Sequence, residues 1–203
     1  MRSKFIISRS YSAPPVNRAD ILRYAGIGGE ADADILALLD ECIELSQGKL
    51  RYNACFCEVS VNICGDDIDL GDIHVTSHSL SRALRNCESA VIFAATVGLD
   101  LDRLIARQSA VSPARALMLE AIGNERIESL CDALCSDIAL EKSEIGYKAR
   151  PRFSAGYGDM SLDVQMDIFD LLECSKNIGV SLNQSLLMTP SKSVTAIIGI
   201  YKQ

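Results

Sequence analysis

The sequence lacks a long apolar run, an excess of positive charge and an evident export signal. No stretch of its 203 residues approaches the ~20 apolar residues that a membrane-spanning helix requires. Its apolar segment near the N-terminus, Phe5-Ile6-Ile7, is shorter than the about 7–15 residues of a signal-peptide core. A formal net charge of −7 gives the chain no general attraction for nucleic acid or an anionic membrane. We therefore expect a cytoplasmic protein with no nucleic-acid partner and no membrane partner.

Internal repeats, low-complexity segments and linkers are also absent from the sequence. The hydrophobic fraction of 48% and the charged fraction of 23% are typical of a globular protein. A chain of this length can bury one substantial core. We predict a single domain that spans residues 1–203.

The eight cysteines do not stand beside the second ligand pair that a zinc site needs. Two pairs have metal-like spacing, Cys55-x-Cys57 and Cys131-x-x-x-Cys135. The first pair lies in an alternating run and the second on an apolar helical face, where free cysteine packs as a small hydrophobe. We interpret both pairs as core residues, and a thiol or metal protein remains the alternative.

The periodicity of apolar residues predicts alternating strands and helices. Strands are expected at 4–10, 53–63, 68–75, 90–95, 185–189 and 193–201. Helices are expected at 17–24, 32–46, 79–87, 100–105, 113–142 and 162–178, with Ser79, Ser112 and Ser161 as caps and Gly179 closing the last of them. Gly123 inside the longest helix suggests close packing of that helix on the sheet. The irregular order favours an α+β fold with an antiparallel sheet layered with helices.

The segment 152–159 has the pattern Arg-x-x-x-Gly-Tyr, followed by Gly158. The Arg152 guanidinium can bind a carboxylate through two parallel hydrogen bonds. Gly156 allows close approach of the backbone to a ligand, and Tyr157 adds a flat face with one polar tip. The combination suits a small zwitterion that carries a planar base, and a plain surface turn is the alternative.

Other polar residues near these motifs have simpler interpretations. Arg150 is an alternative carboxylate ligand, but it does not fit the spacing. Asp159 is expected to cap the following helix or else to contact a ribose. Lys192 is expected to be solvated, and His74 and His78 to be structural or exposed, since no adjacent nucleophile pattern points to them.

Together the motifs resemble the activation domain of cobalamin-dependent methionine synthase, and more closely the short stand-alone proteins related to it. The resemblance is carried by the Arg-x-x-x-Gly-Tyr loop, the Leu-x-x-Gln helix after it and the segment 185–199, with weaker support from 17–24, 94–98 and 127–128. It implies a twisted antiparallel sheet with flanking helices and a site for S-adenosylmethionine.

The resemblance also implies roles for single residues. Arg152 would hold the ligand carboxylate, Gly156 and Tyr157 would line the ligand path with Gly158 beside them, and Glu128 would meet the ammonium or sulfonium. Ala155 stands where the family often has proline, which should loosen the loop slightly. Gly158-Asp159-Met160-Ser161 stands where the full-length synthase has a Pro-Asp-His run, so this chain departs from the family at that segment.

The function implied is that of an accessory subunit with no activity alone. It would supply the reactivation domain in trans to a cobalamin-dependent methionine synthase that lacks its own, with a flavodoxin- or ferredoxin-type reductant. Cobalamin would be carried by the partner, because neither histidine fits a cobalamin-binding Asp-x-His-x-x-Gly segment. The alternative is a non-catalytic interaction module for a corrinoid protein that has lost ligand binding.

Overall fold

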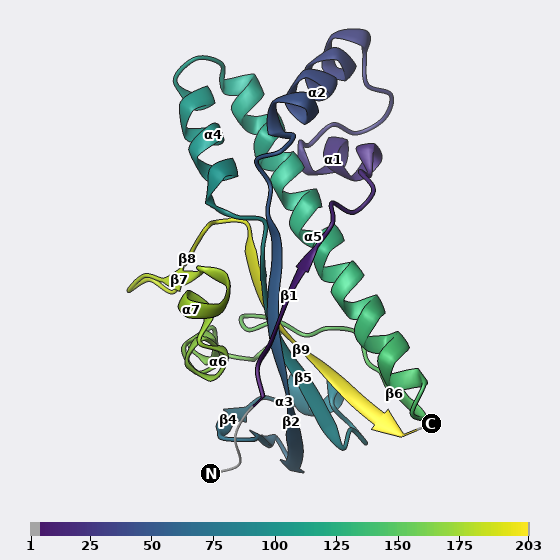
Figure 1. The fold of residues 1–203 in the computed structure, drawn as a ribbon. Coiled ribbons are helices and arrows are strands. Elements are labelled where there is room, and N and C mark those ends of the chain that lie inside the picture. Colours follow the sequence, from purple (N-terminus) through teal and green to yellow (C-terminus); the bar gives the residue numbers. More distant parts are fainter. Residues whose placement is uncertain (1–4, 203) are drawn as a thin grey trace.

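The computed structural model describes residues 5–202, which form an antiparallel sheet covered by helices on both faces (Figure 1). The strands are β1 Ile7–Tyr11, β2 Tyr52–Cys64, β3 Asp67–Leu70, β4 Ile73–Thr76, β5 Ser89–Thr96, β6 Tyr147–Ala149, β7 Ser181–Leu182, β8 Met188–Thr189 and β9 Ser193–Lys202. The helices are α1 Arg18–Tyr24, α2 Ala33–Ser46, α3 His78–Ala83, α4 Leu99–Ser109, α5 Pro113–Ser143, α6 Val164–Leu172 and α7 Cys174–Ile178. The main sheet has the order β4-β3-β2-β5-β9-β6, β1 pairs with β2, and β7 and β8 form a separate pair. The predicted α+β class and antiparallel sheet are confirmed.

The sheet separates two hydrophobic cores, and β5 contributes to both. Val91 and Phe93 join the core beneath α1, α2, α4 and α5. Ile92 and Ala94 face the opposite core, which α3, α6 and α7 cover. The apolar run at 90–95 is therefore a strand buried on both faces, as its composition predicts.

The longest helix, α5, begins where the sequence predicts and runs for 31 residues, or about 46 Å at 1.5 Å per residue. The Ser112 hydroxyl caps it and proline occupies its first turn. The expected reason for Gly123 is wrong, because its close neighbours do not belong to the sheet. A Cβ on Gly123 would lie 2.7 Å from Leu101 Cδ2 on α4 and 2.9 Å from the Lys192 side chain.

Several predicted boundaries differ from the structure. The expected strand at 68–75 is a hairpin of β3 and β4, because Gly71 turns the chain at φ +64°. Of the expected strand at 185–189, only β8 forms, and it pairs with β7. Ser77, rather than Ser79, caps α3. Ser161 instead accepts a hydrogen bond from the Asp163 N–H one turn before α6.

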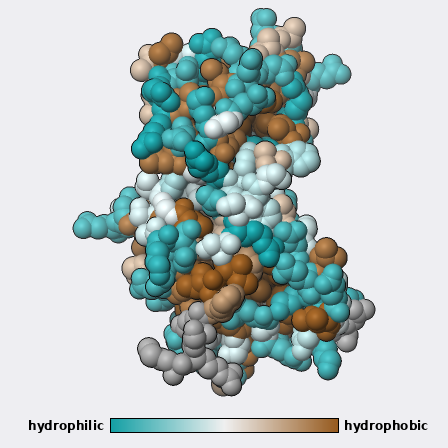
Figure 2. Space-filling model, in the orientation of Figure 1, coloured by the Kyte–Doolittle hydropathy of each residue, from teal (hydrophilic) through white to brown (hydrophobic). Residues whose placement is uncertain are grey.

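The surface seen in Figure 2 mixes polar and apolar residues, with hydrophilic side chains over much of the helical end and a hydrophobic patch in the lower half. Within residues 5–202, none of the helices combines the length and apolarity needed to cross a bilayer.

Candidate functional site

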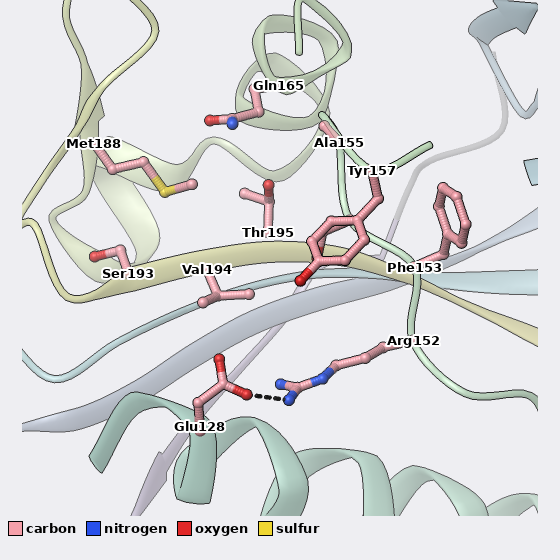
Figure 3. Close-up of a pocket in the computed structure, with 11 residues that line it drawn as sticks. Glu128, Arg152, Phe153, Ala155, Tyr157, Gln165, Met188, Ser193, Val194 and Thr195 are labelled. Carbon is pink, nitrogen blue, oxygen red and sulfur yellow. Dashed lines mark hydrogen bonds and ion pairs between the residues drawn. The ribbon is translucent and has the colours of Figure 1, made fainter. Parts of the chain in front are cut away.

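A cleft of about 320 Å³ opens beside the Arg-x-x-x-Gly-Tyr loop. It lies between α5, this loop, α6 and the segment that leads from β8 into β9 (Figure 3). It is lined by Glu128, Arg152, Phe153, Ser154, Ala155, Tyr157, Gln165, Met188, Ser193, Val194 and Thr195. Its volume is at the lower end of the range of about 300–1,000 Å³ for small-molecule sites.

Backbone hydrogen bonds fix the loop against the sheet. Phe153 and Ile197 of β9 exchange two of them, with N···O distances of 2.9 and 2.8 Å. Farther along, the Gly156 N–H donates to the Met160 carbonyl and the Met160 N–H donates to the Tyr157 carbonyl, both at 3.0 Å. The buried Met160 side chain anchors this turn in the core. The loop therefore presents its side chains from a defined backbone.

Arg152 and Glu128 meet at one end of the cleft as an ion pair. Arg152 Nη2 lies 2.5 Å from Glu128 Oε2 and 3.4 Å from Asp132 Oδ1. The side chains of Arg152 and Glu128 are 23% and 41% exposed. Arg152 Nη1 is buried and has no hydrogen-bond partner among the described residues. The pair thus offers a positive and a negative group side by side, with one donor atom unused.

Arg150, the alternative residue for binding a ligand carboxylate, points away from the cleft. Its Nη2 donates to the Arg85 carbonyl at 3.1 Å, and its guanidinium lies 4.3 Å from the centroid of the Tyr201 ring. Of the two neighbouring arginines, Arg152 is the one that lines the cleft.

The remaining predicted residues of the loop divide into two groups. Ala155 and Tyr157 line the cleft, and the Tyr157 side chain is largely exposed, with its ring edge-to-face against Phe153 at a centroid distance of 6.4 Å. Gly156 and Gly158 do not line it but shape the loop, at φ +83° and +58°.

Gly158 and Asp159 fix the loop to α3. A Cβ on Gly158 would lie 2.6 Å from Ser79 Oγ, which explains the need for glycine. Asp159 accepts hydrogen bonds from the Ser77 hydroxyl at 2.6 Å and from the His78 and Ser79 N–H groups at 2.8 and 3.0 Å. These donors, the Ser77 hydroxyl above all, hold the pKa of Asp159 well below its ordinary value. The prediction that Asp159 caps the helix after the loop is wrong, because its carboxylate accepts instead from the start of α3, much earlier in the chain.

The prediction of a solvated Lys192 is also wrong. Its side chain is 11% exposed, and its Nζ pairs with Glu120 and donates to Asn124 Oδ1 at 2.8 Å. Both histidines are exposed and pair with carboxylates, His74 with Asp69 at 2.9 Å and His78 with Asp66 at 3.0 Å. They lie in or beside the β3–β4 hairpin and do not line the cleft.

The cysteine pairs pack in the cores as interpreted. Cys55, Cys57 and Cys131 are buried and Cys135 is half-buried, and these cysteines are not joined in disulfides. Burial raises the pKa of the Cys135 thiol to about 11, so this thiol is poorly suited to nucleophilic work. Among residues 5–202, no cluster of histidine, cysteine and carboxylate groups suits a metal ion.

Sequence reasoning did not assign Gln165 to the site. This α6 residue is 6% exposed, lines the cleft, and has a buried Oε1 with no hydrogen-bond partner within the described part of the chain. A usable signal existed, since Gln165 stands among Ile168, Leu171 and Leu172 on the apolar face of its helix. Met188, Ser193 and Thr195 were also missed, because they join the cleft only through the path of β8 and β9.

Comparisons with known proteins find a match among solved structures. No protein-family model matches the sequence, and no curated protein matches it. Among solved structures, "Crystal Structure of the MetH Reactivation Domain bound to AdoHcy" matches with a TM-score of 0.68 and 16% sequence identity. The match covers 98% of this chain and 79% of that one. The predicted activation-domain architecture is thus confirmed: the chain has the fold of the MetH reactivation domain.

Proposed function

We propose that this protein binds S-adenosylmethionine in the cleft and acts as an accessory subunit. It acts in trans as the reactivation domain of a methionine synthase that lacks its own, so that the cobalamin of that synthase can be remethylated. The proposal is supported by the fold, because the structural neighbour is bound to AdoHcy, the product left when S-adenosylmethionine gives up its methyl group. Its partners are the cobalamin-carrying synthase and a flavodoxin- or ferredoxin-type reductant in the cytoplasm.

The charged end of the cleft fits the amino-acid part of this ligand, and this observation carries the proposal. Arg152 Nη1 has no acceptor among residues 5–202, and a ligand carboxylate oxygen would supply one. Glu128, on the same ion pair, is placed to accept from an ammonium group. An α-amino acid carries both groups on one carbon, so two opposite charges side by side are the complement that it requires.

The rest of the cleft fits an uncharged, flat group. Tyr157 offers an exposed ring at the rim, and Ala155 and Val194 contribute apolar surface. When bound, S-adenosylmethionine supplies an electrophilic methyl group on its sulfonium. The residues of this chain bind and orient it, and no lining residue is needed as a nucleophile, since the acceptor resides on the partner.

One observation favours a second candidate, an interaction module for a corrinoid protein that has lost ligand binding. Arg152 is already paired with Glu128 and Asp132, so part of its hydrogen-bonding capacity is used without any ligand. This candidate retains the docking function but predicts no affinity for S-adenosylmethionine.

A reconstitution experiment tests the proposed function. The purified protein is mixed with S-adenosylmethionine, a cobalamin-loaded methionine synthase fragment and a low-potential reductant, and methylcobalamin is followed in the visible spectrum. We expect formation only when this protein is present. The Gly156→Val variant should be inactive, because a β-branched residue rarely adopts φ +83° and the loop must move. Equal rates without the protein, or with the variant, would contradict the proposal.

A further inference from the structure

The side chain of Gln165 is buried, and its carboxamide oxygen accepts no hydrogen bond from the described residues. Its side chain reaches from α6 toward the cleft and lies above Thr195 in the view of Figure 3. The residue is 6% exposed, and its Oε1 has no partner among residues 5–202. A buried acceptor without a donor costs folding free energy, so its presence in a cleft points to a donor on a ligand.

The distribution of charge divides the cleft into two ends. The charged lining residues, Glu128 and Arg152, come from α5 and the start of the loop. The end near Gln165 is lined by uncharged side chains, including Met188 and Thr195. A ligand with a zwitterionic head therefore places its head at the first end and its neutral portion at the second.

We propose that the Gln165 carboxamide forms hydrogen bonds with the edge of the adenine base. These bonds would determine the specificity of the cleft for an adenosyl ligand. A carboxamide carries an acceptor and donors in one plane, and adenine offers the complementary amine donor beside a ring-nitrogen acceptor. Gln165 Oε1 accepts from the exocyclic amine, which satisfies the unpartnered atom. This inference rests on the proposed function, since it assigns the base of the same ligand.

A second glutamine in the chain provides a matched control. Gln108 on α4 also has a buried Oε1 without a partner in the described structure, yet it does not line the cleft. An unpartnered glutamine alone therefore does not define the site, and the position of Gln165 in the cleft distinguishes it.

The test compares two ligands on three proteins by calorimetric titration. The ligands are S-adenosylhomocysteine and its analogue with unsubstituted purine, which lacks the exocyclic amine. We expect the wild-type protein to bind the analogue at least about tenfold more weakly. Gln165→Met should lose about tenfold for S-adenosylhomocysteine and bind the two ligands equally well, while Gln108→Met should behave as wild type.

The outcomes separate this inference from the proposed function. Equal affinity of the wild-type protein for both ligands would overturn the role of Gln165 and leave the proposed function standing. No binding of S-adenosylhomocysteine to the wild-type protein would overturn both. The wild-type comparison requires no substitution, so it decides the question even if Gln165→Met does not fold. A Gln165→Met variant that keeps the wild-type preference would also refute the inference.

Discussion

Two arginine–glutamate pairs involve the same helix, α5. They differ in how many of their hydrogen-bonding groups have partners. Arg126 and Glu125 form a bidentate pair whose side chains are 3% and 2% exposed. Arg126 also donates to the Pro14 and Pro15 carbonyls at 2.6 and 2.7 Å, and Glu125 accepts from the Asn17 N–H at 3.1 Å. This pair fastens the segment before α1 onto α5.

The pair of Arg152 and Glu128 is open by comparison. It lines the cleft, is partly exposed, and leaves Nη1 without a partner in the described residues. The difference teaches how to separate the two kinds of site. A closed pair in which every guanidinium nitrogen has a partner stabilises the fold, whereas we propose that an open pair with an unused donor binds a ligand.

The largest expected effect is on the closed pair. Arg126→Met leaves the Glu125 carboxylate buried without its cation, which costs about 3–5 kcal/mol of the free energy of unfolding. Urea denaturation monitored by circular dichroism measures this loss. Arg152→Met is the matched variant, and it should destabilise far less because its partners are partly exposed. Equal losses in the two variants would remove the distinction between the pairs.

A smaller effect is expected for the open pair. It concerns the free energy of ligand binding, not the free energy of unfolding. Arg152→Ala should weaken S-adenosylmethionine binding by more than about tenfold, since a hydrogen bond to a charged group contributes about 1.5–3 kcal/mol. Arg150→Ala, next to the loop but outside the cleft, should change the affinity little. Calorimetric titration of both variants measures the difference, and a small, equal change in each would refute the carboxylate role of Arg152.

The sequence predicted those features whose signals are local. The start of α5 follows from Ser112 with the proline after it, and the buried β5 follows from its uninterrupted apolar run. The Arg152–Tyr157 loop was recognised because its residues are close together in the chain. The role of Glu128 beside this loop was predicted from the resemblance to a known family, not from the spacing of residues.

The sequence did not predict contacts between distant segments. Asp159 caps α3 through Ser77, 82 residues earlier in the chain, and Lys192 reaches Asn124 across 68 residues. Neither partner can be identified from local pattern, because a carboxylate or an ammonium group is equally compatible with solvent. Gln165 differs, since a glutamine on an apolar helical face signals a buried amide that needs a partner.

The smallest effect is expected for Asp159, a third carboxylate that serves the fold from an exposed position. Its hydrogen bonds lower its folded pKa below the unfolded value of about 3.9. Its stabilising contribution is therefore fully present above that value and is lost as the pH falls toward the folded pKa.

We expect Asp159→Asn to be less stable than wild type at pH 7, with the difference shrinking below about pH 4. Thermal unfolding at several pH values measures it. Asp170→Asn, an exposed carboxylate on α6, is the control. A difference between Asp159→Asn and wild type that does not depend on pH would argue against the capping role.

The central claim is that the open pair and the cleft beside it bind S-adenosylmethionine. Its most direct test is a calorimetric titration of the purified wild-type protein with this ligand alone. We predict saturable binding of one molecule per chain, which S-adenosylhomocysteine displaces. The absence of saturable binding, with the fold shown to be intact by circular dichroism, would contradict the claim and favour an interaction module.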